Sequence, residues 1–190
     1  ADILSHRLLA GEDKSRWWHL LIFYGFVLLF FVTCYLMLAH YGHEALFTGT
    51  PYLLVTLVAD LAGAGLILGV LVALLSIRKD ASPARDRTLG KASVLSLLGL
   101  VCVTGFLVEG LRIHSEGDPW KVWSPVGAVA SWQFASLTEL EGHRLFKGLW
   151  WLHSILALGL LAWIPLSARL RHMLFLPFHR ATTPLEPRSP

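Results

Sequence analysis

The chain has 190 residues, of which 55% are hydrophobic and only 15% are charged, with a formal net charge of +3. That balance is too apolar for a soluble globular domain and predicts an integral membrane protein. No nucleic-acid-binding motif is present, so a nucleic-acid partner is excluded.

Four apolar stretches are long enough to cross a bilayer, because a helical span needs about 20 residues. They cover residues 17–39, 52–77, 92–111 and 149–168. The predicted fold class is all-α, an integral membrane bundle of four transmembrane helices with a long extracytoplasmic loop between helices 3 and 4. We expect one domain over residues 1–190, ending in a Pro-rich tail at 173–190.

The first stretch opens with Trp17 and Trp18, an aromatic pair typical of a membrane interface. It carries His19 at its start and His40 at its end, about 31 Å apart along a helix. It is too long for a cleaved signal peptide and lacks a small-residue cleavage site.

The second stretch contains Asp60 among small residues, which allow a neighbouring helix or a flat macrocycle to approach closely. The third stretch follows a cationic loop at 78–91 and ends with Glu109 and Arg112. Charges at that depth need a partner or water.

A long connection over residues 113–148 then carries three tryptophans, Trp120, Trp123 and Trp132. We expect it to lie along the membrane surface as an anchor, with a short helix around Val126–Ser136. The alternative is a docking face for a partner.

The fourth stretch carries His153 near its start and His172 just past its end, about 28 Å apart along the axis. Two helices that each carry a histidine near both membrane faces are what two stacked b-type haems require, because each iron takes one axial nitrogen from each helix. Histidines that simply face lipid headgroups are the alternative.

Orientation follows from the cationic residues, because the N-terminus, the 78–91 loop and the C-terminus hold twelve of the sixteen Lys and Arg. Both termini are therefore predicted to be cytoplasmic. By level, His19 and His172 then pair at the inner haem iron, and His40 and His153 pair at the outer one. His43 and His143 remain alternatives for the second ligand of the outer haem.

Cysteine chemistry adds no further cofactor, since Cys34 and Cys102 lie in different spans and belong to no C-x-x-C or C-x-x-C-H motif. Covalent c-type haem and an iron–sulfur cluster within this chain are excluded.

Three charged residues are predicted at the outer level: Asp60, Glu109 and Arg112. They are candidates for binding and deprotonating a quinol, because quinol oxidation needs a proton acceptor where electrons are removed. The alternative is an intramembrane ion pair of Arg112 with Asp60 or Glu109. Three flanking cations are candidates for pairing with haem propionates, namely Arg16, Lys147 and Arg171.

Several segments together resemble the haem-b membrane subunits of the respiratory nitrate reductase gamma type. The likeness is closest to their relatives in heterodisulfide-reductase-like complexes and in complexes linked to sulfur metabolism or hydrogenases. The segments are RWWHLLIFYGF, PYLLVTLVADLAGAGLILG, VTGFLVEGLRI, WSPVG and LWWLHSILALGLLAWIPLSARLRHMLFLP.

The resemblance implies that His153 and His172 are haem ligands and that His19 supplies a partner. The nitrate reductase type places its next ligand where this chain has Leu29, so His40 is a substitute chosen by level. The resemblance also implies an iron–sulfur partner subunit of the heterodisulfide-reductase type on the cytoplasmic side.

The predicted function is a di-haem cytochrome b subunit that moves electrons between the quinone pool and this partner, in the respiratory chain of a prokaryotic cytoplasmic membrane. The chain alone is then an electron-transfer subunit of an oxidoreductase, in contact with membrane lipid. A stand-alone membrane cytochrome that reduces a small molecule and a haem-free membrane anchor are the alternatives.

Overall fold

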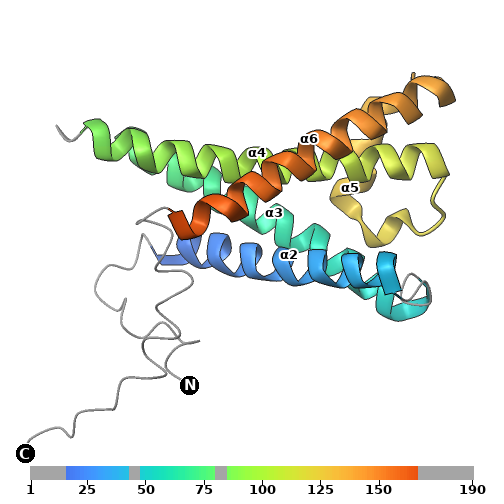
Figure 1. Cartoon of the computed structure of the whole chain (residues 1–190), viewed down its shortest axis with the longest axis horizontal. Coiled ribbons are helices and arrows are strands. Elements are labelled where there is room, and N and C mark those ends of the chain that lie inside the picture. Colours follow the sequence, from blue (N-terminus) through green and yellow to red (C-terminus); the bar gives the residue numbers. More distant parts are fainter. Residues whose placement is uncertain (1–15, 43–47, 80–84, 167–190) are drawn as a thin grey trace, which may run out of the picture.

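The computed structural model describes residues 16–42, 48–79 and 85–166, and within them the chain is helical and contains no strand. Four long helices dominate this part of the chain (Figure 1). They are α2 (Arg16–Gly42), α3 (Gly49–Lys79), α4 (Arg85–Glu116) and α6 (Glu139–Leu166). The connection between α4 and α6 contains α5 (Pro125–Ser131) and two 3-10 turns, η3 (Lys121–Trp123) and η4 (Trp132–Phe134).

All four long helices are apolar and long enough to cross a membrane. A helix satisfies its own backbone hydrogen bonds, which is why a lipid-facing segment adopts this conformation. The four predicted spans and the all-α fold are confirmed as elements. The short helix expected around Val126–Ser136 is also confirmed, as α5 followed by η4.

The fourth long helix begins at Glu139, before the apolar span that the sequence predicts from residue 149. A capping box explains the extension. The Glu141 carboxylate accepts hydrogen bonds from the Thr138 backbone N–H at 3.0 Å and from the Thr138 hydroxyl at 2.6 Å. This pairing satisfies donors at the helix start, so a polar turn is added before the apolar run.

The end of α4 is fixed by a glycine. Gly117 has φ +59°, the left-handed conformation that terminates many helices. The Asp118 N–H then donates back to the Ile113 carbonyl at 3.3 Å. This closure turns the chain out of the span and into the connection that carries α5.

The helices pack at positions where a glycine allows close approach. A Cβ added at Gly25 of α2 would lie 2.9 Å from the Ala62 carbonyl oxygen of α3, and one at Gly69 of α3 would lie 2.8 Å from the Trp18 carbonyl oxygen. α2 therefore packs along α3, and α6 packs along α4 on the other side. The buried core joins all four long helices through Ile22, Leu66, Val70, Ala73, Leu98, Cys102 and Leu160.

Large apolar side chains cover the outside of α2 and α6, among them Phe31, Trp151 and Ile155. Each of these three is more than 60% exposed in the isolated chain. Exposed apolar surface of this extent on long helices is expected of a lipid-facing bundle. The structure is therefore that of a multi-pass membrane protein.

Candidate functional site

His153 lies on the side of α6 that packs against α4, about half-way along that helix. Its Nδ1 atom lies 3.1 Å from the Val101 carbonyl oxygen and 3.1 Å from the Thr104 hydroxyl oxygen. Both partners belong to α4. The side chain is thus tied to the neighbouring helix through one ring nitrogen.

The partners of Nδ1 decide which nitrogen of His153 carries the proton. A carbonyl oxygen only accepts, so Nδ1 must donate to Val101. The Thr104 hydroxyl lies 2.9 Å from the Leu100 and Val101 carbonyls, where it is the donor, which leaves its oxygen free to accept from Nδ1. His153 is therefore the Nδ1–H tautomer, and Nε2 keeps its lone pair.

Gly105 of α4 makes room for the imidazole. A Cβ added there would lie 3.2 Å from Cε1 of His153. Within the described part of the chain, Nε2 has no hydrogen-bond partner. It is accessible, because no buried side-chain nitrogen or oxygen there is without a partner. An imidazole with one nitrogen held by a carbonyl and the other free is the arrangement that metal-ligating histidines have.

Close contacts at glycines run from His153 through α4 and α3 to α2. His153 contacts Gly105, the neighbouring Phe106 contacts Gly63 of α3, and Gly25 of α2 packs against Ala62. These contacts link α6 to α4, α4 to α3 and α3 to α2.

His40 lies fifteen residues beyond Gly25, which is about 22 Å along the axis. The pairing of His40 with His153 at one haem stays a prediction. His19 lies six residues on the other side, about 9 Å along the axis.

The remaining predicted ligands are distributed as follows. His19 is partly buried and meets Trp18 edge-on, with ring centroids 5.9 Å apart. His40 is exposed and contacts Tyr41 in the same way. His143 and Lys147 are exposed on α6. His43, Arg171, His172 and the side chain of Arg16 lie outside the described residues.

Asp60 of α3 holds the start of α5. Its two carboxylate oxygens accept hydrogen bonds from the backbone N–H groups of Val126 at 2.8 Å and Gly127 at 3.0 Å. Only 3% of Asp60 is exposed. Because the helix start offers unpaired N–H groups and a partial positive charge, this contact compensates a buried carboxylate. Asp60 is thus not paired with Arg112.

Arg112 is the centre of an ion-pair network at the same end of the bundle. Its guanidinium binds Glu109 in a bidentate manner, with N–O distances of 3.0 and 2.8 Å. It also binds Glu116 at 2.9 Å and Asp118 at 2.8 Å. The expected ion pair of Arg112 with Glu109 is confirmed, and Asp118 joins it from outside the span.

Close contacts join this network to α5. The Ser124 hydroxyl donates to Glu109 at 3.2 Å. A Cβ added at Gly127 would lie 2.8 Å from Cγ of Glu109, so only glycine fits there. These contacts therefore hold the connection between α4 and α6 against the membrane-spanning helices, through Asp60 and Glu109 on one side and α5 on the other. Its carboxylates are engaged in holding structure together.

Several residues at these sites escaped the sequence analysis. Thr104 and Gly105 look like ordinary small residues in an apolar span, and nothing in the sequence links them to His153. A usable signal existed for α5, because Ser124-Pro125 is a typical helix start. That signal predicts free N–H groups, although it does not say that Asp60 would bind them.

In comparisons with known proteins, no family profile matches the chain, and no solved structure matches it. The chain is similar to a protein named EtfAB:quinone oxidoreductase from Syntrophomonas wolfei, with 27% identity over 173 residues. The match covers 82% of this chain and 23% of that protein. The chain thus corresponds to less than a quarter of its relative's length.

Proposed function

We propose that this chain is a membrane cytochrome b subunit that moves electrons between the quinone pool and a redox partner. The observation that carries the proposal is His153, an intramembrane imidazole whose tautomer is fixed and whose Nε2 lone pair is free. The similarity to a quinone oxidoreductase supports the quinone part.

Haem b fits the chemistry of this donor set. The described residues contain no group of three or more His, Cys, Asp or Glu side chains that could hold a bare metal ion. A haem iron needs at most two protein ligands, because the porphyrin supplies the other four nitrogens. When bound, haem supplies one-electron transfer between ferric and ferrous iron.

For the His153 haem, the proposed second ligand is His40, with His43 and His143 as the alternatives. The paired haems inferred from the sequence remain part of the proposal, with His19 and His172 as the second pair. Arg16, Lys147 and Arg171 would pair with the haem propionates, and Lys147 lies six residues before His153, about 9 Å along α6.

The partner is proposed to be an iron–sulfur subunit of the heterodisulfide-reductase type, as the family resemblance implies. The chain aligns with only part of the quinone oxidoreductase, so the proposal does not assign that protein's full reaction to this chain. What this chain contributes is the path through the membrane. Its helices exclude water around His153 and hold its proton on Nδ1.

The test is a reduced-minus-oxidised visible spectrum of the purified protein, with a haem count per chain. We expect b-type bands, and we expect His153→Ala to lose at least one haem. The matched control is Ser154→Ala, the next residue on α6, which should keep the full haem content. Colourless protein, or full haem in His153→Ala, would refute the proposal. The first result would favour the haem-free anchor.

A further inference from the structure

A depression opens at the C-terminal end of α4, where the connection folds back against it. Its volume is about 290 Å³, near the lower end of the range for small-molecule sites. α4 contributes one side, and η3 and η4 contribute the other. The residues that matter for its chemistry are Ile113, His114, Asp118, Lys121, Trp132 and Ala135.

The depression combines apolar walls with polar donors. Ile113, Ala135 and the indole of Trp132 provide flat and apolar surface. The Lys121 ammonium and the His114 imidazole are hydrogen-bond donors. A flat ring with a carbonyl oxygen on each side has complementary chemistry, because its faces are apolar and its two oxygens accept hydrogen bonds.

The acid in the depression is already engaged. Asp118 accepts a hydrogen bond from the Trp120 backbone N–H at 2.8 Å and pairs with Arg112 at 2.8 Å. Burial raises the pKa of Asp118, and these two contacts together lower it by a larger amount. The pKa of this carboxyl group therefore lies below its ordinary value. Asp118 is therefore ionised and occupied, which leaves Lys121 and His114 to face a ligand.

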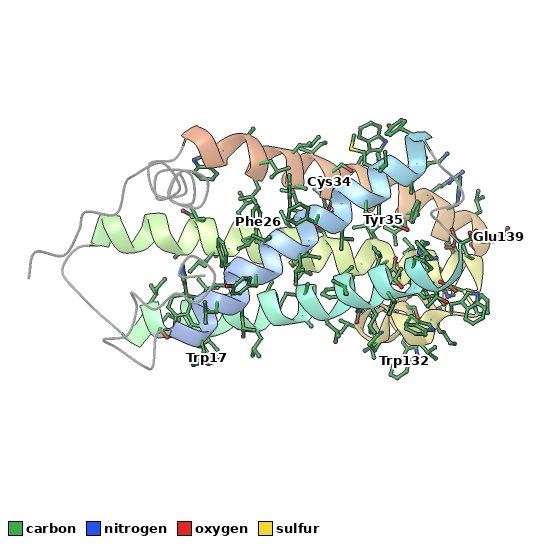
Figure 2. The ribbon with its side chains drawn as sticks, turned by 90° about the horizontal axis from the view of Figure 1, so that it is seen from below. Trp17, Phe26, Cys34, Tyr35, Trp132 and Glu139 are labelled. Atoms are coloured by element: carbon green, nitrogen blue, oxygen red, sulfur yellow. The ribbon has the colours of Figure 1, made fainter. Side chains whose placement is uncertain are left out.

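The depression lies at the boundary of the membrane-spanning region. Ile113 and His114 are in the last turns of the candidate span that ends at Glu116. Trp120 and Trp132 are 59% and 73% exposed, as expected of interfacial aromatic residues. Figure 2 shows Trp132 at the opposite end of the bundle from Trp17. A lipid-soluble ligand with a polar headgroup resides at this depth.

We propose that the depression binds the headgroup ring of a 1,4-quinone, with Lys121 and His114 donating to its oxygens and Trp132 stacking on its face. The inference rests on the proposed function and gives it a location. It moves the quinone site away from Asp60, Glu109 and Arg112, whose groups hold α5 and each other.

The position suits electron exchange with the His153 site. Ile113 lies eight residues after Gly105 on α4, which is about 12 Å along the axis. Conversion of a hydroquinone to a quinone releases two electrons and two protons. A haem held by His153 would accept these electrons one at a time, and the His114 imidazole and water at the open mouth would take the two protons.

The experiment measures binding of a short-chain ubiquinone to the purified full-length protein by isothermal titration calorimetry. Lys121→Gln removes a charged donor and should weaken binding about tenfold. Trp132→Leu removes the stacking surface and should weaken it several-fold. Their matched controls are Arg144→Gln and Trp120→Leu, exposed residues that do not line the depression. Both controls should bind as wild type does.

The haem content of each variant separates this inference from the proposed function. His153→Ala should lose haem and still bind the quinone. Quinone binding that is unchanged in Lys121→Gln and Trp132→Leu would overturn the location and leave the proposed function standing. No quinone binding by wild type would overturn both. Lys121→Gln that weakens only the binding of phosphatidylglycerol vesicles would show an anionic lipid site and overturn the quinone assignment.

Discussion

Thr104 and the Val101 carbonyl together decide the chemistry available at His153. Without an acceptor at Nδ1, the proton of a neutral imidazole is free to occupy either nitrogen. The two α4 oxygens at 3.1 Å remove that freedom and leave Nε2 as the basic nitrogen. A hydrogen bond to the far nitrogen also strengthens a ligand, because it makes the imidazole more basic.

Thr104→Val tests this role, because it keeps the shape of the side chain and removes one of the two acceptors. We expect haem affinity to fall about tenfold, at the lower end of the effect of such partners. Titration of haem-free protein with haemin measures it. Thr104→Ser should bind as wild type, and so should Thr56→Val, whose hydroxyl bonds the Leu53 carbonyl of its own helix. Wild-type affinity in Thr104→Val would contradict the assignment.

Asp118 gives a pH dependence whose sign follows from its lowered pKa. A carboxylate with a lower pKa in the folded state stabilises the fold above the unfolded-state pKa of about 3.9. That contribution is lost as the pH falls through the folded-state value.

We therefore expect the unfolding temperature of the wild type in detergent to fall more steeply below about pH 4 than that of Asp118→Asn. Thermal unfolding between pH 6 and pH 3 measures the difference. Parallel curves for the two proteins would show that the contacts of Asp118 with Arg112 and Trp120 contribute no stability.

At the scale of elements, α5 depends on a residue 66 positions earlier in the chain. Asp60 supplies both acceptors for the first N–H groups of α5, and Gly127 and Gly110 allow α5 to approach α4. A short helix of seven residues is not stable alone. Its position therefore reports whether Asp60 holds it.

Asp60→Ala should destabilise the protein by about 3 kcal/mol or more, since two N–H groups lose a charged acceptor in a buried site. Amide exchange at Val126 and Gly127 should accelerate, while α2 stays protected. Asp60→Asn keeps one acceptor oxygen, so its stability should lie between that of the wild type and that of Asp60→Ala. Unchanged exchange at these two amides in Asp60→Ala would refute the role of Asp60 as the anchor.

The same elements show what a sequence predicts and what it does not. The four long helices follow from hydropathy, because a run of about 20 apolar residues has few alternatives in lipid. The apolar run does not show where α6 begins, because its first turns are polar and the Thr138–Glu141 contact at its start lies outside that run. The contact of Asp60 with α5 joins distant residues and has no local signature.

For the whole molecule, the level of His153 depends on how the helices are staggered. Counting residues from the ends of the spans places His153 beside His40. The close contacts at Gly105, Gly63 and Gly25 show where neighbouring helices meet along their length. Stagger is set by glycine positions on facing helices, and a sequence shows these glycines without showing which partner each one meets.

Orientation in the membrane is a further property of the whole molecule, and the cationic residues predict it. The loop over residues 78–91 holds five Lys and Arg, whereas Lys121 is the single cation between residues 113 and 143. Cationic loops stay on the cytoplasmic side. The 78–91 loop should therefore face the cytoplasm, and α5 with the depression around Lys121 should face the opposite side.

Single cysteines test the orientation in a chain in which Cys34 and Cys102 are replaced by alanine. In intact cells, a membrane-impermeant maleimide should label Ser136→Cys and should leave Ser82→Cys unlabelled until the membrane is opened. The reverse labelling would invert the bundle and place the depression in the cytoplasm. Protons from a quinol at Lys121 and His114 would then be released on the same side as a cytoplasmic partner. In the expected orientation they leave on the far side, so electron transfer inward also separates charge across the membrane.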